Sequence, residues 1–395
     1  MSNKNARGGS IFGGALLVAG TSVGAGMLAL PVFSALGGFL PAIVIYFICW
    51  AFMAGAGLLM LEATLWSSGE TNIVSMAEST LGPLGKFVAW GLYIFLFYSL
   101  NVAYIAGGGK LIADLLGMTE MVWVAPLFFV ALFGPVVLIG ARAVDRTNVL
   151  LMIGLILSYI IFVMLGIKHV KIENLMRADW PMSLLSVPIA ITSFGYQGIV
   201  PTITTYMRRD VKKTRRVILI GSAIPFVIYA LWEWLVLGIV PLTGPRGLAE
   251  ALISGDSVVR PLSATLHSEK LLMVSLVFAF CALVSSFLGV SLGVRDFLAD
   301  GLKIKKTQKG KLLISALIFI PPIIISMTYP SIFLTALKVG GGLGCTLLLG
   351  LLPVLMVWQG RKKQQKAPYR FFGGKVTLAL MILFVIAELT IEFIY

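Results

Sequence analysis

The chain has 395 residues, of which 58% are hydrophobic and only 12% are charged. A water-soluble protein carries about 25% charged residues, so the surplus apolar side chains must face something other than water. This composition excludes an ordinary soluble protein and predicts an all-α polytopic membrane protein. The net charge of +14 does not indicate nucleic-acid binding, because the basic residues gather in short connections between apolar stretches. Such residues favour the cytoplasmic face of a membrane.

A membrane-spanning helix needs about 20 mainly apolar residues. We expect eleven spans, at about 10–33, 39–66, 86–109, 122–141, 147–167, 183–206, 217–240, 271–294, 311–328, 331–358 and 374–394. The basic clusters near residues 208–216, 295–311 and 361–375 then fall on one side. This distribution predicts a cytoplasmic N-terminus and a C-terminus on the opposite face.

Two of the expected spans contain breaks. The first reads Gly20-Thr-Ser-Val-Gly-Ala-Gly-Met27, with Pro31 after it, and the sixth reads Thr192-Ser-Phe-Gly-Tyr-Gln-Gly198, with Pro201 after it. Glycine and proline at this density do not hold an unbroken helix. In lipid, such backbone survives only where protein buries it or where it lines a cavity. Paired interruptions in two halves of a chain indicate the central site of a secondary transporter.

The breaks open the first and the sixth span, so each half of the chain contains five spans. Because five is odd, the second half enters the membrane from the opposite side, which predicts an inverted 5+5 repeat. The expected organisation is a cytoplasmic tail at 1–9, a first five-helix repeat at 10–167, a second at 183–358 and an eleventh span at 374–394. The connection 241–270 has room for one or two short surface helices. It either caps the outer vestibule or is a passive loop.

At these residues the chain resembles the hydroxy and aromatic amino acid permeases, especially their tyrosine-specific branch. Segments 20–31, 191–201 and 285–300 are similar to the signatures of the first, sixth and eighth helices of that family. The resemblance implies a leucine-transporter-type fold. It also implies proton-driven uptake of an aromatic amino acid across the bacterial inner membrane. Gln197 stands where family members often have histidine, and Lys338 stands where an uncharged residue is expected.

An amino acid zwitterion brings two charges into low dielectric, and each must be met by charges or dipoles. The start of the second half of a broken helix offers free N–H groups and partial positive charge. We expect the N–H groups of Gly24, Ala25 and Gly26 to bind the carboxylate. The unwound carbonyls are the candidates for the ammonium group: Thr21, Ser22, Ser193 and Phe194.

The side chain of the substrate needs an apolar pocket with a few polar groups. Tyr98, Asn101 and Tyr104 follow a spacing of three and so share one face of the third span. Phe194 and Tyr196 offer stacking surfaces. Either Asn101 or Gln197 is expected to hydrogen-bond a phenol hydroxyl.

Coupling needs an ionisable or ion-binding group, and ionisable residues inside spans are functional candidates. Glu62, Glu233 and Lys338 are the coupling candidates: a buried carboxylate can carry a proton, whereas Lys338 is the candidate for a fixed cation that substitutes for a bound sodium. Ser285 and Ser286 are the candidates for a sodium site in its place. We expect Glu388 and Glu392, close to the end of the last span, to be solvated.

The leading hypothesis is a proton symporter that imports L-tyrosine by alternating access around spans 1 and 6. The alternatives are a tryptophan or broader neutral amino acid permease, sodium-coupled symport and, more distantly, a channel. No His or Cys cluster falls in a span, so no enzyme, metal or cofactor is expected. The expected partners are the amino acid, the coupling ion and the lipid bilayer.

Overall fold

The structure is a computed structural model, which describes residues 9–67, 69, 71–118, 121–266, 268–304, 307–363 and 368–394. Of the predicted N-terminal tail, only Gly9 lies within the described residues. Within this part of the chain every regular element is a helix. Ten helices are long and apolar enough to cross a membrane, and a bent pair of shorter helices brings the number to eleven. Both the all-helical class and the number of spans agree with the sequence.

The first half contains five spans and one short surface helix. Its elements are α1 (Ile11–Ser22), η1 (Ala25–Leu28), α2 (Leu30–Ser34), α3 (Phe39–Trp66), α4 (Ile73–Leu81), α5 (Pro83–Leu116), η2 (Val122–Val124), α6 (Ala125–Ile139), α7 (Ala141–Gly166) and η3 (Ile167–His169). The long helix α5 begins with Pro83 and ends at Gly117, whose φ of 66° is left-handed. Proline is favoured at a helix start because the first N–H groups have no partner within the helix. Glycine is favoured just past the end because it adopts a left-handed φ without strain.

The second half contains the remaining spans. Its elements are α8 (Ile172–Leu175), α9 (Trp180–Ser183), η4 (Leu184–Ser186), α10 (Val187–Ser193), η5 (Gln197–Ile199), α11 (Val200–Tyr206), α12 (Val211–Ile239), α13 (Leu248–Ser254), α14 (Val259–Thr265), α15 (Glu269–Gly301), α16 (Gln308–Thr328), α17 (Phe333–Thr335), η6 (Ala336–Leu343), η7 (Thr346–Leu351), α18 (Leu352–Lys363) and α19 (Gly374–Ile394). The Asp210 carboxylate caps α12 by accepting a hydrogen bond from the Lys213 N–H at 3.0 Å. This bond holds the pKa of Asp210 below its usual range.

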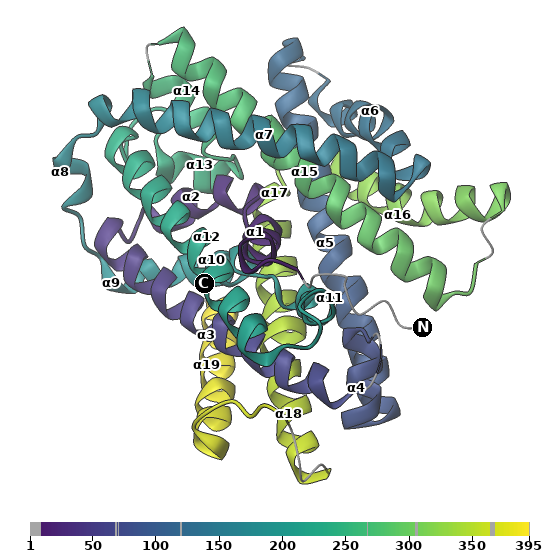
Figure 1. Cartoon of the computed structure of the whole chain (residues 1–395). Coiled ribbons are helices and arrows are strands. Elements are labelled where there is room, and N and C mark those ends of the chain that lie inside the picture. The colour runs from purple at the N-terminus through teal and green to yellow at the C-terminus, as the bar shows by residue number, and fades with distance from the viewer. Residues whose placement is uncertain are drawn as a thin grey trace.

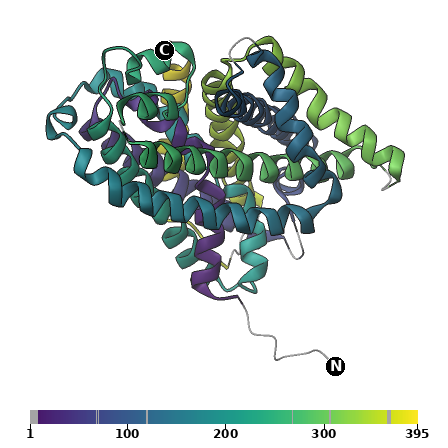
Figure 2. The ribbon, with the colours of Figure 1, turned by 90° about the horizontal axis from the view of Figure 1, so that it is seen from above.

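Helix packing repeats between the two halves. The first span packs through α1 against α12 of the seventh, and the sixth packs through α10 against α3 of the second. Likewise α5 of the third span packs against η6 of the tenth, and α15 of the eighth lies along α7 of the fifth (Figures 1 and 2). When five is added to or subtracted from each span number, the pair 1–7 becomes the pair 6–2 and the pair 3–10 becomes the pair 8–5. This is the pattern of a 5+5 repeat with α1 near the centre of the bundle (Figure 1). The repeat limits at 10–167 and 183–358 stay predictions.

The tenth span is unusual because η6 and η7 are π-helical. Three consecutive glycines, Gly340 to Gly342, face three neighbouring spans. A methyl group on Gly340 would collide with Ser99, and one on Gly341 would lie 2.6 Å from Thr192 Oγ1. A methyl group on Gly342 would lie 2.7 Å from Pro188 Cβ. The tenth span therefore packs with almost no side chain between it and the sixth.

Candidate functional site

The first span is broken at Val23 and Gly24, where its two halves meet at 46°. The Ala25 N–H turns away from its own helix and donates to Ser286 Oγ on α15 at 3.0 Å. Among the described residues, the N–H groups of Gly24 and Gly26 donate no hydrogen bond. Free N–H groups at a helix start attract an anion. Within the described chain, the predicted N–H groups of Gly24 and Gly26 are therefore unpaired although the backbone at the break is buried, and Ser286 takes up the N–H group of Ala25.

The second break follows Ser193, where α10 ends and the chain continues as Phe194, Gly195 and Tyr196 before η5. It lies directly against the first break. A methyl group on Gly26 would sit 2.6 Å from Ser193 Oγ, and one on Gly24 would sit 2.5 Å from Ser286 Oγ. The glycines are needed for this close approach, since a side chain at Gly26 would enter the contact between the broken spans and one at Gly24 would collide with α15.

Tyr229 of α12 joins the two breaks. Its hydroxyl lies 2.6 Å from the Ser22 carbonyl and 2.9 Å from the Ser193 carbonyl, and its ring centroid is 5.3 Å from that of Phe194. One turn further along α12, the indole N–H of Trp232 donates to the Met27 carbonyl at 2.9 Å. The sequence reasoning missed both residues. The only signal for them is an aromatic pair at a spacing of three on one helical face.

Buried polar atoms without partners surround these breaks. Within the described chain, Ser22 Oγ, Ser193 Oγ and Asn101 Nδ2 are buried and make no hydrogen bond. The Asn101 carbonyl oxygen accepts from Ser291 Oγ at 2.8 Å, which leaves its amide nitrogen as an unused donor. Tyr104, one turn along α5, lies beside Ser286. Because buried polar groups are normally satisfied, these atoms are the candidates for polar contacts with a ligand.

The comparison with known proteins agrees with this geometry. A model of the tryptophan/tyrosine permease family matches residues 7–392. The chain belongs to this family. It is 32% identical over 384 residues to tyrosine-specific transport system 1 of Haemophilus influenzae, with 96% of both chains covered. It is 33% identical over 394 residues to a tryptophan-specific transport protein of Pseudomonas aeruginosa, with 96% of this chain and 93% of the relative covered. The predicted permease class is thereby confirmed, and the chain is a transport protein rather than an enzyme.

A solved structure shows the same fold. The permease superposes on the crystal structure of MhsT in complex with L-phenylalanine with a TM-score of 0.68, at 16% identity and over 98% of this chain and 99% of that one. The predicted leucine-transporter-type fold is confirmed by this likeness. At such low identity the similarity concerns the fold alone.

Three side chains predicted to contact the substrate are engaged elsewhere in this permease. The Tyr98 hydroxyl donates to the Leu317 carbonyl of α16 at 2.6 Å. The Tyr196 hydroxyl lies 3.5 Å from the Met53 carbonyl of α3, and the Gln197 amide donates to the same carbonyl at 2.9 Å. Thr21, whose carbonyl is the predicted contact, is exposed, and its hydroxyl is bonded to Leu17 of its own helix. The other predicted residues of this set are buried: Ser22, Asn101, Tyr104, Ser193 and Phe194.

The predicted coupling acids Glu62 and Glu233 are fully buried and have partners. Both oxygens of Glu62 accept from Arg361 at 2.8 Å, and Oε2 also accepts from the Phe371 N–H at 2.7 Å. Glu233 accepts hydrogen bonds from Ser34 and, at 2.9 Å, from the Tyr46 hydroxyl. Glu62 thus links the second span to the tenth, and Glu233 links the seventh span to the first and the second.

The other coupling candidates are placed differently. The Ser285 hydroxyl donates to the Ala282 carbonyl of its own helix at 3.2 Å, whereas Ser286 accepts from the first break. Lys338 is half-buried on η6 and lies toward Glu392. The expectation that Glu388 and Glu392 are solvated is wrong, because they are 1% and 9% exposed. The sequence placed them near a helix end but did not show that this end packs against η6, η7 and α10.

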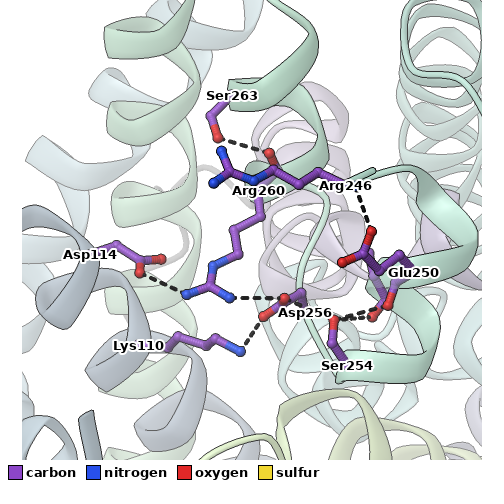
Figure 3. Close-up of polar contacts among 9 residues, drawn as sticks. Lys110, Asp114, Arg246, Glu250, Ser254, Asp256, Arg260 and Ser263 are labelled. Atoms are coloured by element: carbon purple, nitrogen blue, oxygen red, sulfur yellow. Dashed lines mark hydrogen bonds and ion pairs between the residues drawn. The ribbon is translucent and has the colours of Figure 1, made fainter. Parts of the chain in front are cut away.

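The connection 241–270 forms two short helices, α13 and α14, as the sequence predicts. They enclose a cavity of about 500 Å³ together with the end of α5 and part of α15. Figure 3 shows Arg260 extending between two carboxylates, Asp114 at 3.1 Å and Asp256 at 3.2 Å. Lys110 of α5 forms a second ion pair with Asp256. The Val258 N–H also donates to the Leu28 carbonyl at 3.0 Å, so the loop is attached to both the first and the third span.

Replacing Asp256 with asparagine is expected to loosen this attachment. Asp256 is largely buried and serves two cations, and its removal costs about 1.5–3 kcal/mol, as for a hydrogen bond to a charged group. Amide hydrogen exchange in α13 and α14 is expected to accelerate by roughly 10- to 100-fold. Asp114→Asn is the control, since Asp114 is 40% exposed and pairs with Arg260 alone. Equal exchange rates in the two variants would contradict the attachment.

Proposed function

We propose that this permease imports an aromatic amino acid, foremost L-tyrosine, in symport with a proton, by alternating access around the two breaks. The observation that carries the proposal is the contact between them, where Gly26 lies beside the Ser193 hydroxyl and the N–H groups of Gly24 and Gly26 are unused within the described chain. These N–H groups suit a carboxylate. The Ser22 and Ser193 carbonyls, which share the single hydroxyl of Tyr229, suit an ammonium group.

The membrane and orientation belong to the same proposal. The family relatives named above are bacterial permeases, and the basic connections fall on one face. We place the chain in the inner membrane with its N-terminus in the cytoplasm and its C-terminus in the periplasm, following the preference of Lys and Arg for the cytoplasmic side.

Asn101 supports tyrosine over tryptophan. Its unused amide N–H is a donor, and a phenol oxygen accepts such a bond while an indole N–H does not. Tryptophan remains the second candidate, because a tryptophan-specific relative is as similar to the chain as a tyrosine-specific one.

Replacing Asn101 with leucine is expected to lower the affinity for tyrosine by up to about tenfold, the value of one neutral hydrogen bond. The affinity for phenylalanine is expected to stay within about twofold. The measurement is competition by each amino acid against labelled tyrosine. Ser291→Ala is the matched control, since it removes the partner of Asn101 but not the amide. Equal losses for both amino acids would show that Asn101 does not recognise the hydroxyl.

The proposal as a whole is tested in vesicles containing the purified protein. Proton and sodium gradients are imposed separately, and labelled tyrosine is offered with unlabelled tryptophan, phenylalanine or leucine. We expect uptake under the proton gradient alone and competition by aromatic amino acids. Uptake under the sodium gradient alone would show that sodium, and not the proton, is the coupling ion. Equal competition by leucine would show that the site does not prefer aromatic amino acids.

A further inference from the structure

Helix α19 carries two carboxyl groups that point into the protein. Glu388 and Glu392 are one turn apart and so share a helical face. They are 1% and 9% exposed, although their neighbour Thr390 faces outward. This face packs against η6 and η7 of the tenth span and against α10 of the sixth. The last span therefore buries these two ionisable residues against the tenth span and against the half of the sixth span that ends at the second break.

These carboxyl groups lack the partners that Glu62 and Glu233 have. In the part of the chain that the structure describes, both oxygens of Glu388 and Oε2 of Glu392 make no well-aligned hydrogen bond. Thr346 of η7 is fully buried and lies within reach of Glu388, but its hydroxyl and the carboxyl group are not aligned for a hydrogen bond. The carboxyl groups of Glu388 and Glu392 and the hydroxyl of Thr346 thus lie in one buried region, and each of them can take part in a hydrogen bond that holds a proton.

The charges around the pair are few. From the tenth span, Lys338 faces Glu392, and the thiol of Cys345 lies near Glu388. From α3 the thiol of Cys49 lies near Glu388. The helix α10 has no titratable residue. The nearest cation on α19 is Lys375, thirteen residues before Glu388 and hence about 20 Å away along the helix. Among the described residues, neither acid forms an ion pair.

A buried carboxylate without a partner costs several kcal/mol, and two carboxylates one turn apart also repel each other. The conformation described here therefore favours the pair with at least one proton bound. Ionisation requires a second conformation in which water or the Lys338 ammonium reaches the carboxylate.

We propose that Glu388 and Glu392 form the proton-binding site of this permease. The inference rests on the proposed function, and it names the residues that carry the symported ion. On one face of the membrane a carboxylate accepts a proton and forms an O–H bond. On the other face that bond breaks and the proton leaves, with no change in oxidation state.

A short path of contacts connects this pair with the substrate breaks. A methyl group on Gly342 would lie 3.1 Å from Glu392 Oε2 and 2.7 Å from Pro188 Cβ, so only backbone separates the acid from α10. The Thr192 hydroxyl donates to the Pro188 carbonyl at 2.8 Å, and Ser193 of the second break follows. Ionisation of Glu392 would draw water between α19 and the tenth span. The half-span that ends at Ser193 would then lose its packing partner. π-helical turns often mark functional sites, and here they lie between the acids and the break.

The test compares two assays of the full-length protein in vesicles. Exchange of labelled for unlabelled tyrosine at equal pH needs no net proton movement, whereas accumulation driven by an imposed pH gradient does. For Glu388→Gln, Glu392→Gln and the double variant we expect exchange within about twofold of the wild type, since that corresponds to only about 0.4 kcal/mol. We expect the double variant to lose pH-driven accumulation completely. Glu388→Asp keeps a titratable group and is expected to retain part of it. Thr390→Ala, on the outer face of α19, is the matched control for both assays.

Two results would overturn the inference while the proposed function stands. The double variant accumulates tyrosine under the pH gradient as the wild type does, or the glutamine variants lose exchange together with accumulation, which indicates a structural role. Failure of the proposed function looks different, because it appears in the wild type. The wild type then exchanges no aromatic amino acid, or it accumulates one in response to sodium and not to pH, and in either case the inference falls with it.

Discussion

Replacing Gly26 with valine is expected to lower the affinity for tyrosine at least about 100-fold. The new Cβ would lie 2.6 Å from Ser193 Oγ, so the side chain would fill the contact between the two breaks. It would also cover the free N–H groups of the first break. Each lost hydrogen bond to the substrate carboxylate costs about 1.5–3 kcal/mol, and about 1.4 kcal/mol is a factor of ten. Equilibrium binding of labelled tyrosine to the purified protein is the measurement.

The control for this variant is Gly20→Ala. Gly20 precedes the break on α1, and a methyl group there would meet only Met152 Cε, at an ordinary 3.8 Å. Binding is expected to change little, because alanine also favours the helix. Retained binding in Gly26→Val would show that the carboxylate is held elsewhere. Loss of binding in both variants would show that α1 as a whole, rather than the close contact at Gly26, is sensitive.

Replacing Arg361 with leucine is expected to destabilise the protein by about 3–5 kcal/mol, the cost of leaving one member of a buried ion pair alone. Glu62 is fully buried, Arg361 is 11% exposed, and two bonds of 2.8 Å join them. Arg361 also donates to the Phe371 carbonyl at 3.0 Å. The pair therefore links α3, α18 and the connection to α19. The measurement is thermal unfolding of the purified protein in detergent.

Two further variants define this effect. Arg361→Leu combined with Glu62→Gln is expected to recover a large part of the lost stability, because no isolated charge remains. Lys86→Ala breaks the Lys86–Glu78 pair, in which both side chains are about half exposed. Such surface pairs contribute about 0–1 kcal/mol. If Arg361→Leu were no more destabilising than Lys86→Ala, the pair would not be a structural link.

The broken spans and the fold were accessible from the sequence because they depend on local chemistry. Glycine and proline interrupt helices wherever they cluster, and Gly24 and Ser193 lie where the helices end. The span count and the inverted order follow from hydropathy and parity. The tenth span reaches three neighbours closely through the small residues Gly340 to Gly342, and small residues are the sequence signal for such close approach of membrane helices.

The sequence did not allow us to predict which side chains of each span point into the protein. A span in lipid is apolar on all sides, so its sequence gives no inward face comparable to that of an amphipathic helix. Tyr196 and Gln197 stand beside the second break but turn toward α3. Tyr229, which lies six spans along the chain from the first break, bonds to the Ser22 carbonyl. The burial of Glu388 depends in the same way on how α19 packs against its neighbours.

The π-helical winding of the tenth span also sets the angle of everything that follows it. A π turn holds an additional residue compared with an α turn, and one residue of α-helix corresponds to a rotation of roughly 100°. Deleting a single residue from Thr346–Leu351 would straighten the winding and rotate α18 on its axis. Arg361 would then leave Glu62 and face another neighbour. The additional residue in the π-helical winding thus sets the rotation of α18 at which Arg361 meets Glu62.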